Sequence, residues 1–458
     1  MIENDAFKLL LINLFHLNPN DITNIVCTTF NKMMVLLVTL ADKHQACPYC
    51  GFTAPKIKEY VTKEITHSAL TTQKCIIKYR ARRYKCSCCG KTYYEFNPFV
   101  FKSQKISILT VHNILKDLKD FNETFTSVAR RYHVSPTSVS TIFDKHVDIG
   151  RNPLPEIINF DEVYAFKSEK SKYVCVLLDF KKQIPVDVLP NRKKEYLLNY
   201  FQKIPLEERK KVKYACSDMY EVYRDVVHKV FPEAKHLLDY FHLSQDFHKK
   251  MNEVRIKVMK GYKDDKASDK YYLLKKFNWL LFKNPEDEDK YGRLFDVERE
   301  RKYNSHFKSY MNYYDLRKKI LEINNDLTIC YSLKLELVDF YSKSTIDNAQ
   351  VNLEHLIRSF IDTNIEEMIK FSNNLINWKQ EIINSFTIVG TEYKVEADKG
   401  QVVVCNKKVN NAIIENRNKI IKCIKNNANG YTNWSRFRNR VMYVLDPSAT
   451  FSLEPREK

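Results

Sequence analysis

The sequence predicts a multidomain α/β protein, and three observations support that fold class. Two pairs of closely spaced cysteines lie within residues 44–92. Two short helical patterns separated by a turn follow in residues 103–148. Beyond them, runs of β-branched and aromatic residues alternate with amphipathic helical patterns, which is typical of a sheet covered by helices. With 458 residues, the chain is long enough for several such units, each with its own core.

The composition limits the kind of partner. The chain carries 75 Lys and Arg against 56 Asp and Glu, a formal charge of +19. A basic excess favours a polyanionic partner, because each neutralised phosphate releases condensed counterions, although a solvated basic surface explains the charge equally well. Glycine is scarce, with 8 residues, and neither GxGxxG nor GxxxxGK[ST] occurs, which argues against a nucleotide-driven enzyme.

Neither a secretory signal nor a membrane span is expected. The first strongly apolar run, residues 33–41, is too short to cross a bilayer and lies inside the chain. Five of the 12 cysteines lie in two tight clusters and the others are scattered singly. That pattern favours one metal site plus free thiols in a reducing compartment, so we expect a cytoplasmic, nucleoid-associated protein.

The clustered cysteines form two turns, CPYCG at residues 47–51 and CSCCG at residues 86–90. Each CxxC places two thiolates on one tight turn, and the following glycine lets the backbone reverse. Four thiolates in a tetrahedral shell favour Zn²⁺. We therefore predict a structural zinc ribbon over residues 44–92, with the ligands Cys47, Cys50, Cys86 and Cys89. Cys88 could replace Cys86 or Cys89, but the pair that preserves CxxC is preferred.

The segment before the second cysteine turn, KYRARRYK at residues 78–85, mixes cations with tyrosines. Cations suit phosphate contacts and tyrosines suit stacking on bases or sugars. A charged strand edge that discourages aggregation would have the same composition. Beside a zinc ribbon we favour DNA contact by Arg80, Arg82, Arg83 and Lys85.

Residues 124–147, TFTSVARRYHVSPTSVSTIFDKHV, have the pattern of a helix-turn-helix. The turn falls near residues 133–135, where Ser135 is a plausible N-cap and Pro136 suits the first position of the second helix. The exposed face of that helix offers Thr137 and Ser138, which are small enough to enter a major groove. A plain three-helix packing unit is the alternative, and the basic segment before it favours DNA binding.

After residue 155 the pattern changes to strands and helices in a fixed order. Strand patterns at residues 157–166, 172–180 and 183–190 precede a helix at 193–201, a strand at 212–221, a helix at 221–231 and a strand at 235–242. This is the order of a ribonuclease-H-like core. In such a sheet Asp161 lies on the central first strand and Asp218 at the end of the adjacent fourth strand. Paired carboxylates suit Mg²⁺ or Mn²⁺, and phosphoryl transfer on DNA typically uses two such ions.

A third carboxylate must come from another part of the chain, and Glu415 is the best candidate. At helical spacing Glu415 shares one face with Asn418, Lys419, Lys422 and Lys425, while isoleucines form the other face. An ordinary amphipathic surface helix is the alternative. We expect Lys419 and Lys422 to contact DNA beside the acid.

Two further residues compete for a place in this site. Asp239 ends the fifth strand near the same sheet edge and is the serious rival of Glu415. With His242 it could supply an extra ligand, or it could orient the ligands through hydrogen bonds without touching the metal. Glu162 should point to the opposite face of the strand from Asp161, because side chains alternate along a strand, and we do not expect it to be a ligand.

The spacing of the acids implies a large insertion. Asp218 and Glu415 lie 197 positions apart (415 − 218), and the chain between them is dominated by helical patterns. We therefore expect five segments. They are an N-terminal segment with the ribbon (1–100), the helix-turn-helix (101–150), the first part of the core (151–245), an α-helical insertion (246–400), and the completion of the core with a C-terminal tail (401–458).

Taken together, these motifs resemble the ISL-three family of bacterial insertion-sequence transposases. The resemblance covers nearly the whole chain, from the cysteine turns and FDEVYAF (160–166) to NNAIIENRNKIIK (410–422) and NGYTNWSRFRNR (429–440). It implies that Asp161, Asp218 and Glu415 are the acids of a DDE-type polynucleotidyl transferase that holds two Mg²⁺ or Mn²⁺ ions beside a structural Zn²⁺. The family usually has Gly where this chain has Asn416 and commonly Arg where it has Asn426.

The resemblance also implies partners and a reaction. The protein would bind the terminal inverted repeats of its element, cleave there, join the freed 3′ ends to target DNA, and work as a homodimer or higher oligomer on DNA, with no membrane partner. An inert regulator descended from a transposase, and a nuclease without strand transfer, remain as alternative hypotheses.

Overall fold

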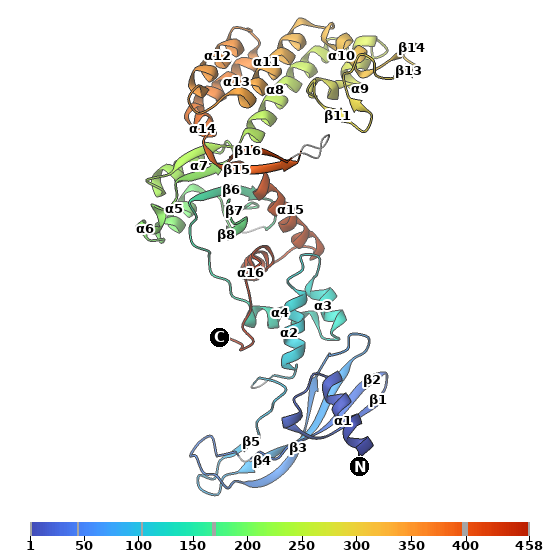
Figure 1. Cartoon of the computed structure of the whole chain (residues 1–458), viewed down its shortest axis with the longest axis vertical. Coiled ribbons are helices and arrows are strands. Elements are labelled where there is room, and N and C mark those ends of the chain that lie inside the picture. Colours follow the sequence, from blue (N-terminus) through green and yellow to red (C-terminus); the bar gives the residue numbers. More distant parts are fainter. Residues whose placement is uncertain (1, 44, 102–103, 167–170, 396–401, 457–458) are drawn as a thin grey trace.

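A computed structural model describes the chain apart from residues 1, 44, 102–103, 167–170, 396–401 and 457–458. The fold is mixed α/β and elongated, as the expected fold class requires (Figure 1). A β-rich unit forms one end, a group of helices forms the other, and a five-stranded sheet lies between them. Among the described residues, no helix combines the length and apolar character needed to cross a membrane.

The N-terminal unit is a five-stranded sheet with one covering helix. Its strands have the order β1-β2-β4-β3, with β5 paired to β4, and only β2 and β4 run parallel. The core under α1 is apolar and includes Phe15, Leu36 and Ile77. The elements are α1 (Ile2–Leu14), the short 3-10 helix η1 (Pro19–Asp21), β1 (Ile22–Phe30), β2 (Met33–Leu40), β3 (Lys56–Thr66), β4 (Cys75–Lys85) and β5 (Thr92–Tyr94).

Three helices follow: α2 (Ile108–Asp117), α3 (Phe125–Arg131) and α4 (Pro136–His146). Ser135 caps α4 by accepting a hydrogen bond from the Ser138 N–H, and Pro136 occupies its first position. These helices pack against α16 (Trp434–Leu445) near the other end of the chain. The Tyr443 hydroxyl donates to the Leu115 carbonyl at 3.0 Å, and Arg436 forms an ion pair with Asp144 at 2.6 Å.

The central sheet has the strand order β10-β9-β6-β7-β8, with β6 in the middle. β6, β7 and β8 are antiparallel to one another, whereas β9 and β10 run parallel to β6. Its strands are β6 (Ile157–Val163), β7 (Val174–Asp179), β8 (Ile184–Leu189), β9 (Tyr214–Ser217) and β10 (Lys235–Leu238).

Helices cover both faces of this sheet. Phe160 and its even-numbered neighbours on β6 pack against α5 (Lys194–Gln202) and α7 (Glu221–Val230), with the short α6 (Leu206–Arg209) between them in the chain. Val163, on the odd-numbered side, packs with α15 (Ala412–Asn427) and α16. Because side chains alternate along a strand, Asp161 faces α15.

Residues 240–384 form the helical end of the molecule around a large apolar core (Figure 1). The predicted helical insertion (246–400) also contains two short β-hairpins and the first strand of a longer hairpin, whose second strand begins at residue 402. The helices are α8 (Tyr240–Lys260), α9 (Asp269–Lys276), η2 (Asn278–Leu281), α10 (Tyr313–Leu321), α11 (Asn325–Lys343), α12 (Ala349–Ile361), α13 (Glu366–Asn377) and α14 (Lys379–Asn384). The hairpin strands are β11 (Glu288–Asp289), β12 (Gly292–Arg293), β13 (Lys302–Asn304), β14 (Ser309–Met311), β15 (Ile388–Val395) and β16 (Val402–Lys408).

Candidate functional site

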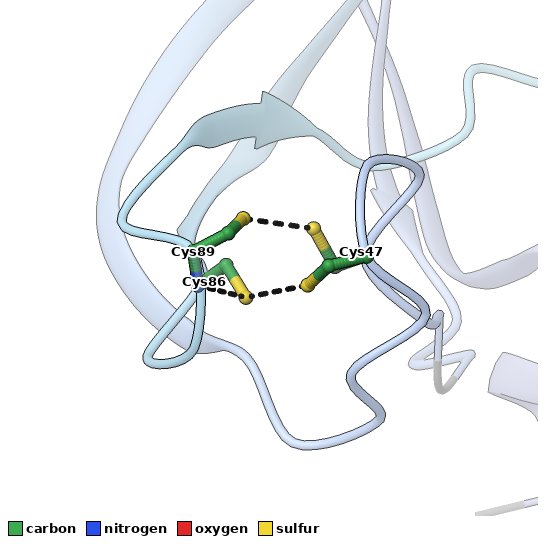
Figure 2. A group of neighbouring side chains, drawn as sticks. Cys47, Cys86 and Cys89 are labelled. Atoms are coloured by element: carbon green, nitrogen blue, oxygen red, sulfur yellow. Dashed lines mark hydrogen bonds between the residues drawn. The ribbon is translucent and has the colours of Figure 1, made fainter.

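The four predicted ribbon cysteines lie together on two loops, one between β2 and β3 and the other between β4 and β5. Cys47 Sγ lies 3.7 Å from Cys89 Sγ, and Cys50 Sγ lies 3.5 Å from Cys86 Sγ (Figure 2). All four sulfurs lie within 4.8 Å of one another. Sulfurs bound about 2.3 Å from a tetrahedral zinc would lie about 3.8 Å apart, so this cluster could hold Zn²⁺ with little rearrangement.

The backbone of the two cysteine turns is nearly the same. Gly51 and Gly90 have φ values of 76° and 71°, a left-handed conformation that favours glycine. Their N–H groups donate to the carbonyls of Cys47 and Cys86. The Cys89 N–H donates to the Cys86 thiol and lowers the pKa of Cys86 to about 7, whereas contacts within the same group of thiols raise the pKa of Cys50 and Cys89. Cys88 is exposed and lies outside the cluster.

The cations on β4 that we expect to contact DNA differ in their exposure and in their ion pairs. Arg80 and Lys85 are exposed. Arg82, however, forms an ion pair with the buried Glu95 at 2.7 Å and also donates to the carbonyls of residues 40 and 41. Arg83 pairs with Glu59 across the strands. The structure therefore uses Arg82 and Arg83 to join strands and segments of the sheet, and sequence reasoning had no means of seeing those partners.

On α4, the second helix of the predicted helix-turn-helix, Thr137 is exposed and Ser138 is half-buried. The Ser138 hydroxyl lies 2.8 Å from that of Ser135. Both residues lie in the first turn of α4, which is the end of a recognition helix that meets base edges in known complexes.

A group of carboxylates collects where the central sheet meets α15 and α8. Asp161 lies on β6, Asp218 directly follows β9, and Asp239 follows β10 as the N-cap of α8. His242 lies in the first turn of α8, with its Nε2 atom 3.8 Å from Asp239 Oδ2 and 3.9 Å from Glu415 Oε1. The ligand atoms of Asp239, His242 and Glu415 lie within 4.8 Å of one another, an arrangement that could hold a metal ion.

Buried carboxylates this close together destabilise the folded protein unless a cation neutralises them. Burial raises the pKa of Asp161 to about 7, and the charge of Asp218 adds to that rise. Burial also raises the pKa of Asp218 to about 7, with a further contribution from Glu162. Within the described part of the chain, Asp218 Oδ1, Asp239 Oδ2 and His242 Nε2 are buried and have no hydrogen-bond partner. Unpaired buried oxygen and imidazole atoms that face one another are the donor set of a divalent cation.

Sequence analysis missed the groups that hold Asp161 in place. Asn418 was expected on the polar face of its helix, but it is buried, and its amide donates to Asp161 Oδ2 at 2.8 Å. The reason is the helical period, because residue 418 falls in the same stripe as Ile414 and Ile421, at spacings of four and three. Lys419 and Lys422 are exposed beside this stripe, and Glu415 lies at its edge.

Two further buried asparagines join β6 to the start of α15. The Asn159 amide donates to the Asn411 side-chain oxygen at 2.7 Å and to the Asn410 carbonyl at 2.8 Å. The Asn411 amide donates in return to the Phe160 carbonyl at 3.3 Å. These bonds span about 250 positions of sequence and fix the helix that carries Glu415 on the strand that carries Asp161. A sequence does not show which distant residue an asparagine will contact, so these bonds could not be predicted.

Glu162 lies on the opposite side of β6 from Asp161, as expected. It forms an ion pair with Arg192 and accepts a hydrogen bond from the Tyr223 hydroxyl of α7. These partners engage its carboxylate on the α5–α7 side of the sheet.

The central sheet is covered by helices on both faces, and buried acids lie between it and α15. Comparison with known proteins identifies a family for the chain. A model of the ISL-three DDE family, described as transposase, matches residues 158–397, which is more than half of the chain. The chain therefore belongs to this transposase family.

The chain is also similar to a transposase for insertion sequence element IS1001 from Bordetella parapertussis. The two are 19% identical over 410 residues, which cover 89% of this chain and 90% of that relative. The matched family region contains Asp161, Asp218 and Asp239 and ends before Glu415.

Proposed function

We propose that this protein is the transposase of a bacterial insertion sequence, which cleaves DNA at the ends of its element and joins the freed 3′ ends to target DNA. The observation that carries the proposal is the buried acid cluster on the α15 face of the central sheet. Its carboxylates come from four separate segments, and two of their oxygens, Asp218 Oδ1 and Asp239 Oδ2, are buried without a hydrogen-bond partner among the described residues. Family membership supports the same function.

Asp161, Asp218 and Glu415 are the proposed ligands of two Mg²⁺ or Mn²⁺ ions. Asp239 and His242 lie beside Glu415 and complete that side of the cluster. The bound ions would activate the attacking oxygen and stabilise the leaving oxygen of the phosphodiester. The protein's contribution is positional: Asn418 orients Asp161, and the Asn159–Asn411 pair holds α15 on the sheet. The exposed Lys419 and Lys422 on α15 face the phosphate backbone in this proposal.

We further propose the domain organisation that the sequence predicts. Residues 1–100 hold a structural Zn²⁺ through Cys47, Cys50, Cys86 and Cys89, and residues 101–150 form a DNA-binding helix-turn-helix. Residues 151–245 and 401–458 form a ribonuclease-H-like core, interrupted by the helical insertion 246–400. The strand order of the central sheet and the geometry of the sulfur cluster support this assignment.

The proposed partners are the terminal inverted repeats of the element and the target DNA, bound by a homodimer or higher oligomer. Arg80 and Lys85 on β4, with Thr137 and Ser138 on α4, are the proposed recognition residues. This function places the protein with the chromosome in the bacterial cytoplasm.

The test uses the full chain and a duplex carrying one end of the element with its flanking DNA. Wild-type protein with Mg²⁺ should cut at the end and join it to a plasmid, whereas Asp161→Asn and Asp218→Asn should bind the end and do neither. Cutting without joining would identify a nuclease. Specific binding without cutting by the wild type would identify an inert DNA-binding regulator, and either result would overturn the proposal.

A further inference from the structure

A polar groove of about 440 Å³ lies between the helix-turn-helix unit and the turn that joins α15 to α16. α3 contributes one wall and the α15–α16 turn contributes the other. The polar residues that line it include Thr126, Arg130, Asn427, Asn429, Thr432 and Asn433. None of these residues belongs to the acid cluster or to the recognition residues proposed above.

The chemistry of the groove suits an anion. None of the described residues that line it carries a carboxylate, and its polar groups are hydroxyls, amides and two guanidinium groups. Arg436 is one of the two, and Asp144 already holds it through two hydrogen bonds. Arg130 is exposed and forms no ion pair with any residue that the structure describes. Hydroxyl, amide and arginine donors are the groups that contact DNA phosphates in protein complexes.

The groove is held in shape by the packing of its two walls. The rings of Phe125 on α3 and Tyr431 on the turn meet edge to face, with centroids 6.3 Å apart. The buried Arg440 of α16 donates to the carbonyls of Asp120 and Glu123, both at 2.8 Å. An anion would therefore enter a site that needs little ordering, which favours binding.

The position of the groove relative to the acid cluster is set by α15, which runs from the central sheet toward α3 (Figure 1). Glu415 lies near the start of this helix and Asn427 at its end, 12 residues later (427 − 415). At about 1.5 Å per residue they are about 18 Å apart along the axis. The exposed Lys419 and Lys422 lie between them. A strand of DNA lying along α15 would cover that distance with only a few nucleotides.

We infer that this groove binds a phosphodiester of the element's end, a few nucleotides from the bond that is cut. The inference rests on the proposed function, because it takes the acid cluster as the place of cutting. Bound there, the phosphate fixes the register between the sequence read by the helix-turn-helix and the scissile bond. In this proposal Arg130 supplies the positive charge, and the amides of Asn427 and Asn429 lie beside the bound phosphate.

The experiment measures binding of full-length protein to end DNA in Ca²⁺ at several salt concentrations. Arg130→Gln removes one phosphate contact, so the slope of log affinity against log salt should become shallower by about 1. Asn429→Asp puts a negative charge in the groove and should weaken binding about tenfold or more. Its backbone, with φ of 53°, accepts aspartate as it accepts asparagine. Lys203→Gln is the control, since Lys203 is exposed at the end of α5 on the opposite side of the sheet.

A single neutral methylphosphonate moved along the DNA locates the contact. In the wild type, substitution at one position a few nucleotides from the cut should weaken binding, and in Arg130→Gln the same substitution should cost nothing more. An unchanged salt slope in Arg130→Gln, or an equal methylphosphonate effect in both proteins, overturns the inference. Cutting by the wild type is measured in the same preparation with Mg²⁺. If the wild type cuts but the groove variants bind normally, only the groove inference is wrong; if the wild type does not cut, the proposed function is wrong.

Discussion

Replacing Asp161 with asparagine should stabilise the protein in Mg²⁺-free buffer at neutral and alkaline pH. Burial raises the pKa of this carboxyl from 3.8 to about 7 in the folded protein. Between those two values the folded chain holds a proton that the unfolded chain has lost, so the carboxyl destabilises the fold increasingly as the pH rises from about 4 to about 7. Above pH 7 the full cost remains.

The size of the effect follows from the pKa change. A rise of about 3 units at 1.36 kcal/mol each gives about 4 kcal/mol at most above pH 7, and less than half of that at pH 5. At about 2.1 cal/mol/K of unfolding entropy per residue, a chain of 458 residues shifts by about 1 °C per kcal/mol, so the variant should melt about 4 °C higher than the wild type at pH 8. Asn418 can accommodate the change, because its Oδ1 atom has no partner among the described residues and could accept a hydrogen bond from the new amide.

Calorimetric melting of wild type, Asp161→Asn and the control Glu207→Gln checks this prediction. Glu207 has a side chain that is 81% exposed, so its substitution should leave the melting temperature unchanged at every pH. Millimolar Mg²⁺ should raise the melting temperature of the wild type at pH 8 and have much less effect on Asp161→Asn. A melting difference that does not grow between pH 5 and pH 8 would refute the reasoning.

Three further changes separate the roles of individual residues. Cys89→Ser should lower bound zinc in the purified protein from about one ion per chain to near none, while Cys88→Ser should retain it; metal analysis of both decides the ligand set. Glu415→Gln should reduce Mg²⁺-dependent cutting more than Asp239→Asn, and the opposite ranking would make Asp239 the third acid. Asn418→Leu removes the donor to Asp161 and should raise the Mg²⁺ concentration for half-maximal cutting about tenfold, with end binding unchanged; an unaltered Mg²⁺ dependence would show that this bond does not position the acid.

Much of the central sheet could be predicted from the sequence because its signals are local. Short segments rich in β-branched, aromatic and other apolar residues mark the strands, which are four to seven residues long. The alternation of side chains along β6 places Asp161 and Glu162 on opposite faces, and the structure shows this arrangement. The mixed α/β class was predicted correctly for the same reason.

Contacts between distant parts of the chain could not be predicted. Asn418 lies in an apolar stripe, and a single polar residue there looks the same as one on the exposed face until its partner is known. The packing of α16 on the helix-turn-helix, through Tyr443 and Arg436, joins residues about 300 positions apart. Arg82 and Arg83 have the composition of a DNA contact, yet carboxylates from neighbouring strands and loops engage both. In each case the missing information was the identity of a tertiary partner.

The most direct test of the central claim is diffraction from crystals of the protein with end DNA and Mn²⁺, recorded at the manganese absorption edge. The account predicts two anomalous peaks about 3.5–4 Å apart beside the carboxylates of Asp161, Asp218 and Glu415, which would hold the two ions. Peaks that avoid Asp161 and Asp218, or no peak near the sheet when Mn²⁺-dependent cutting is measured in the same preparation, would contradict it.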